Sequence, residues 1–187
     1  MALKIEKTFQ VPEPIEQVWG ILSDPGQVAT CVPGAQITDQ VDDKTYHGII
    51  RVKVGPSVTN YKGEVQIVRL DVQNHEIEIL GKGQDVRGRG SASMKMTGQL
   101  SVLPDGGTEV KSVSEVNVVG ILAQMGSRVI TEVSNIMFDE FTKSFQARLK
   151  RPSDAPEAQG SPAGEAQPIK AGSLAWKATK GLFRGKP

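Results

Sequence analysis

Few side chains in this 187-residue sequence are of the types that carry out catalysis. The two histidines, His47 and His75, fall on an outward-facing strand position and in a turn. Neither belongs to a serine–histidine–acid set or to a metal-ligand spacing. The single cysteine, Cys31, excludes a disulfide framework and lies in an apolar stretch, where a packed thiol fits better than a nucleophile. We therefore expect no enzymatic activity, no metal and no covalently bound cofactor.

The glycine-rich stretch from Gly81 to Gly90 is not a dinucleotide-binding loop, because its glycine spacing differs and a strand follows it instead of a helix. The plain interpretation is a long hairpin tip. Arg87 and Arg89 at that tip are candidates for contacting a phosphate or an acidic partner.

The C-terminal residues 169–187 have the composition of a segment that binds a membrane surface. On a helical wheel the basic side chains gather in one arc, and Trp, Phe and Leu side chains occupy most of the remainder. We expect these apolar residues to insert into the lipid: Leu174, Trp176, Leu182 and Phe183. We expect these basic residues to contact the phosphates of an anionic membrane: Lys177, Lys180 and Arg184. The alternatives are a helix that docks on a partner protein and a disordered basic end.

Residues 152–168 contain many Pro, Ala and Gly residues and no bulky apolar side chain, which predicts a flexible linker. The region before it, residues 1–151, is nearly neutral, which argues against a nucleic-acid-binding surface there. Charges interrupt the apolar residues of the N-terminus, so it does not resemble a signal peptide. No apolar run approaches the length of a membrane span, and we expect a cytoplasmic protein.

The elements that would position any site are a long helix and a set of strands. Apolar residues recur at steps of three and four from Gly120 to Arg151, which predicts one continuous helix roughly 45 Å long. Before it, alternating apolar and polar residues predict seven strands, six of them joined by short hairpins, with two short helices after the first strand. This order predicts an α+β fold in which an antiparallel sheet grips the C-terminal helix.

Several positions on the inward faces of these strands hold small residues, Gly48, Gly63 and Gly98 among them. A curved sheet with small inward residues can leave an apolar space under the helix, suited to a ligand. The alternative is that the glycines only allow the sheet to bend. The pattern alone favours neither.

Short motifs spread over residues 1–150 resemble those of one known family. They include Phe9-Gln-Val-Pro, Cys31-Val-Pro-Gly, Val52-Lys-Val-Gly-Pro, Tyr61-Lys-Gly and Leu122-Ala-Gln-Met-Gly-Ser-Arg. Their number and order resemble the CoxG-like family of carbon monoxide dehydrogenase subunits, which belongs to the START-like, or SRPBCC, helix-grip superfamily. The resemblance implies a deep apolar cavity between the sheet and the C-terminal helix. It also implies association with aerobic molybdenum-containing carbon monoxide dehydrogenases or related hydroxylases, their attachment to the membrane, and use of the quinone pool. It supplies no catalytic residues.

Together these points lead to the hypothesis of a quinone-binding adaptor, peripheral on the inner face of the cell membrane, that takes menaquinone or ubiquinone into the cavity. The residues expected to line that cavity are Trp19, Val28, Val32, Tyr61, Met94, Met96, Val118, Leu122, Met125 and Val129. One rival is a membrane anchor or assembly factor without a ligand. The other is a small polyketide-cyclase-like enzyme, for which polar lining would be required; Ser112, Ser114 and Tyr61 are the main candidates.

Overall fold

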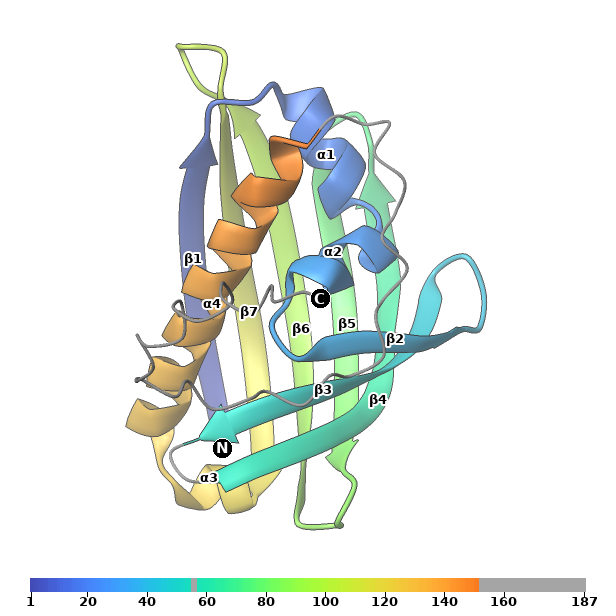
Figure 1. Cartoon of the computed structure of the whole chain (residues 1–187), viewed down its shortest axis with the longest axis vertical. Helices are drawn as coiled ribbons and strands as arrows, with labels where there is room; N and C mark the ends of the chain where they lie inside the picture. The colour runs from blue at the N-terminus through green and yellow to red at the C-terminus, as the bar shows by residue number, and fades with distance from the viewer. Residues whose placement is uncertain (55–56, 152–187) are drawn as a thin grey trace, which may run out of the picture. The chain divides into compact units, whose positions relative to one another are not determined.

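The structure, a computed structural model, describes residues 1–54 and 57–151 (Figure 1). The predicted linker and basic tail, with Leu174, Trp176, Lys177, Lys180, Leu182, Phe183 and Arg184, lie outside the described residues. The elements in chain order are β1 (Ala2–Val11), α1 (Ile15–Leu22), α2 (Pro25–Cys31), β2 (Ala35–Gln40), β3 (Thr45–Val54), β4 (Ser57–Asp71), β5 (Glu76–Asp85), β6 (Gly90–Val102), β7 (Thr108–Gly120), α3 (Ile121–Gln124) and α4 (Ser127–Leu149).

The strands form a single antiparallel sheet in the order β1-β7-β6-β5-β4-β3-β2. Strands β2 to β7 follow one another as a meander, and β1 joins the sheet beside β7 at the opposite edge from β2. Figure 1 shows α4 crossing one face of the curved sheet, with α1 and α2 beside its C-terminal half. The predicted α+β fold, an antiparallel sheet gripping a C-terminal helix, is confirmed.

The strand register defines which side chains share the inner face, the one that α4 covers. Residues that pair across an antiparallel ladder point to the same side of the sheet. One such row runs from Leu3 through Val116, Met94 and Gly81 to Val65. The outer face carries the alternate positions and is polar, with cross-strand ion pairs such as Lys95 to Glu78 at 2.9 Å.

Two predicted boundaries are wrong. The predicted helix Gly120–Arg151 is interrupted: α3 ends at Gln124, and α4 begins at Ser127. Gly126 between them has a φ of 86°, a left-handed conformation that an α-helix does not contain. The stretch from Gly81 to Asp85 continues β5, where the sequence predicted part of a hairpin tip. Gly81, Gly83 and Asp85 face inward, whereas Lys82 and Gln84 face outward, so the alternation of a strand continues to the end of β5.

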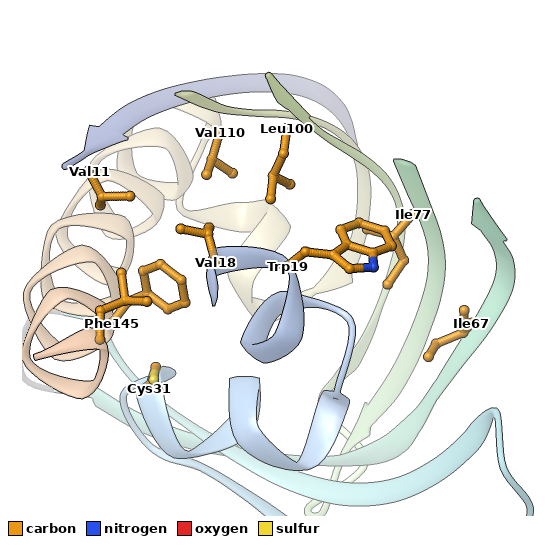
Figure 2. Packing of buried hydrophobic residues seen from close by; sticks show 10 residues of the cluster. Val11, Val18, Trp19, Cys31, Ile67, Ile77, Leu100, Val110 and Phe145 are labelled. Carbon is orange, nitrogen blue, oxygen red and sulfur yellow. The ribbon is translucent and has the colours of Figure 1, made fainter. Parts of the chain in front are cut away.

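The hydrophobic core lies at one end of the sheet, where α1, α2 and the C-terminal half of α4 meet it (Figure 2). Phe145 of α4 is fully buried, and its ring packs edge-on against Phe9 of β1 with centroids 5.8 Å apart. Trp19 of α1 packs edge-on against His75, which follows β4. We call this region the packed end; its buried inner-face residues on the sheet are Val11, Ile67, Ile77, Leu100 and Val110.

Candidate functional site

The middle of the inner face remains accessible to solvent, whereas both ends of it are buried. Along β5 the inward positions run from buried Ile77, through three half-buried residues, to buried Asp85. Strand β7 repeats this order between Val110 and Val118. On β4, Val65 is 37% exposed although it faces inward between two buried residues. We call this region the middle zone; it comprises Val65, Ile79, Gly81, Met94, Met96, Ser114 and Val116.

The residues predicted to line a cavity lie in different parts of the region between the sheet and the helices. Met94 and Met96 lie in the middle zone, and the buried Tyr61 and Val118 lie just beyond it, away from the packed end. Trp19 lies in the packed end, beside Ile77 in Figure 2. Since Ile77 and Gly83 are six residues apart on β5, Trp19 is separated from the Tyr61 region by roughly 20 Å along the strand.

The remaining predicted lining residues belong to the helices and are half-buried. Val28 is in α2 and Val32 directly follows it, while Leu122 is in α3 and Met125 follows α3. Val129 lies in the first turn of α4. At 100° per residue it stands about 160° around the helix from Phe145, so it is not on the side that carries the buried phenylalanine.

The surroundings of the inward glycines bear on both interpretations of the small-residue pattern, namely space for a ligand and bending of the sheet. A Cβ on Gly81 would lie 3.4 Å from Cε of Met94, and one on Gly83 would lie 3.5 Å from Cβ of Tyr61. The side chains of Met94 and Tyr61 therefore lie in ordinary van der Waals range of the Cβ positions of these two glycines. Gly63 has a different role: a Cβ there would lie 2.0 Å from the carbonyl oxygen of Lys82, so β4 and β5 approach closely only because this residue is glycine.

A buried polar group closes the inner face beyond the middle zone. Asp85, at the end of β5, is 3% exposed. Its carboxylate accepts hydrogen bonds from Nε of Arg89 at 2.9 Å, from the second guanidinium nitrogen at 3.4 Å and from the Arg89 backbone at 3.1 Å. The hydrogen bond from the Arg89 side chain is the largest cause that lowers the pKa of Asp85. Arg89, predicted as a candidate for a phosphate or acidic partner, thus has its partner within the chain.

Tyr61 pairs with Asp85 across β4 and β5, so the two side chains share the inner face. Tyr61 is 4% exposed, and its buried hydroxyl oxygen has no hydrogen-bond partner within residues 1–54 and 57–151. Burial raises the pKa of this phenol, with a further contribution from the Asp85 carboxylate. The hydroxyl is therefore protonated at neutral pH and can donate a hydrogen bond.

Asp85 was not among the residues predicted for the site. Asp85 continues the inward alternation of Ile77, Ile79, Gly81 and Gly83, but the sequence predicted a hairpin tip from Gly81 onward in place of a strand.

The outer face of the sheet also contains two open hollows, whose lining mixes charged side chains with apolar ones such as Leu80. They include Lys4, Glu64, Lys82 and Glu115, and Lys82 pairs with Glu64 at 3.2 Å. Several charged side chains would have to lose water on contact with an apolar ligand there, which disfavours this face for such a ligand. Within residues 1–54 and 57–151 no group of three or more His, Cys, Asp or Glu side chains is placed to hold a metal ion. In the same part of the chain no helix is long and apolar enough to cross a bilayer.

The chain was compared with protein families and with known proteins. The model of the CoxG family, described as a subunit of carbon monoxide dehydrogenase, matches residues 8–150. None of the curated proteins searched matches the chain.

Among solved structures, a conserved protein from Geobacillus kaustophilus is similar with a TM-score of 0.71 and 18% identity, over 79% of this chain and 95% of that one. A START superfamily protein from Mycobacterium smegmatis is similar with a TM-score of 0.55 and 12% identity, over 78% and 96%. The Zhui aromatase/cyclase from Streptomyces sp. R1128 is similar with a TM-score of 0.52 and 13% identity, over 80% and 92%. At these identities the likeness shows a shared START-like fold.

Proposed function

Because the chain belongs to the CoxG family of carbon monoxide dehydrogenase subunits, we propose that it binds a long-chain isoprenoid quinone and links such a dehydrogenase, or a related molybdenum hydroxylase, to the membrane quinone pool. The observation that carries the proposal is the middle zone. Apolar side chains on the inner face there keep part of their surface accessible, although they lie between two buried ends.

An isoprenoid quinone matches the chemistry of this region. Its chain is apolar and flexible, and the unbranched thioether side chains of Met94 and Met96 adapt to irregular apolar shapes. Covering the accessible surface of the middle zone with such a chain removes apolar area from water, which favours binding by roughly 25 cal/mol per Å². The proposed ligand is menaquinone or ubiquinone.

The C-terminal residues supply the proposed membrane contact. The basic and apolar composition of residues 169–187 fits reversible attachment to an anionic surface on the inner side of the membrane. The linker of residues 152–168 would let the domain take up quinone at the bilayer and still reach a soluble dehydrogenase.

Native mass spectrometry of the full-length protein, after incubation with quinone-loaded vesicles, tests the proposal. We expect a stoichiometric quinone complex. Met94→Asp should lower the affinity at least about tenfold, because an apolar chain would have to desolvate the new carboxylate. Ser93→Asp, which places the same charge on the outer face, is the matched control and should bind as the wild type does.

If the wild-type protein stays free of quinone after this incubation, the ligand-binding proposal is wrong. The remaining interpretation is then a membrane anchor or assembly factor that works without a ligand. Turnover of a polyketide substrate by the wild-type protein would instead support a cyclase-like enzyme.

A further inference from the structure

The Tyr61 hydroxyl is a buried polar group without a partner in the part of the chain that the structure describes, and such groups are rare in folded proteins. The other tyrosine, Tyr46, also lies on the inner face, but its hydroxyl donates to the Asp43 carbonyl at 3.4 Å and accepts from Gln40 at 3.4 Å. Of the two tyrosines, only Tyr61 lacks a hydroxyl partner within the described residues, where Oε2 of Glu13 is the other buried side-chain oxygen without one.

The ring of Tyr61 leans toward the middle zone. The ideal Cβ position on Gly83 is 3.5 Å from Cβ of Tyr61 and 3.9 Å from its Cδ1, so the ring lies over this glycine. Gly83 is next to the middle zone along β5, two residues after Gly81. A ligand in the middle zone would thus have Tyr61 at one end of it.

The neighbouring charges determine what kind of group this hydroxyl suits. Arg89 donates to both oxygens of the Asp85 carboxylate, so the pair carries no net charge. A pair without net charge gives an anionic ligand group nothing to offset its loss of hydration, so an uncharged acceptor suits the Tyr61 hydroxyl better. Burial raises the pKa of the Tyr61 phenol and so favours its protonated form, which leaves the proton free to donate.

We propose that the Tyr61 hydroxyl donates a hydrogen bond to a carbonyl oxygen of the quinone head group. The head group then lies beside Tyr61 and Gly83, and the isoprenoid chain extends over Met94 and Met96. Because the hydroxyl is closed off from water, the head group reaches it by displacing the side chains that cover it. This inference rests on the proposed quinone binding.

Tyr61→Phe tests the inference, with Tyr46→Phe as the matched control in the full-length protein. The probes are a 2-methyl-1,4-naphthoquinone with a four-unit isoprenoid chain and squalene, a hydrocarbon without a carbonyl group. We expect Tyr61→Phe to weaken naphthoquinone binding about 5–10-fold and to leave squalene binding unchanged. Tyr46→Phe should change neither.

Two further measurements separate recognition from folding. The carbonyl stretching band of the bound naphthoquinone should be red-shifted in the wild type and return toward its vesicle value in Tyr61→Phe. The Tm of the ligand-free Tyr61→Phe protein should equal or exceed that of the wild type, because the variant removes an unsatisfied buried hydroxyl.

Equal naphthoquinone affinities and carbonyl bands in the wild type and Tyr61→Phe would overturn the inference while quinone binding stands. A parallel loss of naphthoquinone and squalene affinity would also overturn it, because the role of Tyr61 would then be structural. Absence of naphthoquinone binding to the wild type would overturn the proposed function itself.

Discussion

Asp85 and Arg89 form the only ion pair of the described residues in which one side chain is fully buried. Removing one partner of such a pair leaves a charge that the surrounding structure must still accommodate. Asp85→Asn should therefore lower the Tm by an amount of the order of 10 °C at pH 7, measured by calorimetry. Glu115→Gln, at an exposed position of the outer face, is the control and should leave the Tm within about 2 °C.

The same pair predicts a pH dependence. The pKa of Asp85 is lower in the folded protein than its ordinary value of about 3.9. A depressed folded-state pKa contributes stability that is present above the ordinary value and is lost as the pH falls through the folded-state value. Between about pH 5 and pH 2 the Tm of the wild type should thus fall more steeply than that of Asp85→Asn. Parallel Tm profiles would show that Asp85 is not the group responsible.

At this scale the sequence allowed only part of the site to be predicted. The inward positions of Tyr61, Met94 and Met96 follow from strand period, and the register bears them out. The Asp85–Arg89 pair could not be predicted, because it depends on a turn that brings Arg89 back onto a residue four positions earlier. The lack of a partner for Tyr61 depends on the packing of every side chain around it.

At the scale of elements, the close approach of β4 and β5 depends on Gly63. A methyl group there would meet the Lys82 carbonyl oxygen at 2.0 Å and the Gly83 Cα at 2.7 Å, both backbone atoms of the paired strand. Gly63→Ala should lower the free energy of unfolding by about 3 kcal/mol, measured by urea denaturation.

Gly20 on the exposed side of α1 provides the control for this prediction, since nothing lies within 4 Å of its Cβ position. Gly20→Ala should raise the free energy of unfolding by about 0.5–1 kcal/mol, because alanine favours the helix. A Gly63→Ala protein as stable as Gly20→Ala would mean that the two strands can separate without cost.

The strands and helices could be predicted where the alternation or spacing of apolar residues extended over many positions. Seven strands and the C-terminal helix follow from alternation and from apolar spacing, and the structure confirms them. The interruption at Gly126 was not predicted, because apolar residues continue at helical spacing on both sides of it. Its left-handed φ is a property of the backbone that the spacing of side chains does not record.

At the scale of the whole molecule, membrane attachment is predicted to depend on the C-terminal tail. Replacing Lys177, Lys180 and Arg184 together by Glu should reduce binding to anionic vesicles at least about 100-fold, since each basic residue near such a surface contributes about 1 kcal/mol. Cosedimentation with vesicles of rising anionic lipid content measures this. Three reversals elsewhere, at the exposed Lys62, Arg87 and Lys150, are the control. A greater loss in the control would place the membrane contact on the folded domain.

Packing between the sheet and the helices is uneven, so the residues that stabilise the fold are different from those that contact the proposed ligand. Folding free energy is concentrated at the packed end, where Phe145 and its neighbours are buried. Side chains of the middle zone bury less apolar area, so exchanging them costs less stability. A few substitutions in the middle zone can therefore change the ligand preference while every intermediate sequence still folds. The fold itself is shared with chains that are only 12–18% identical to this one.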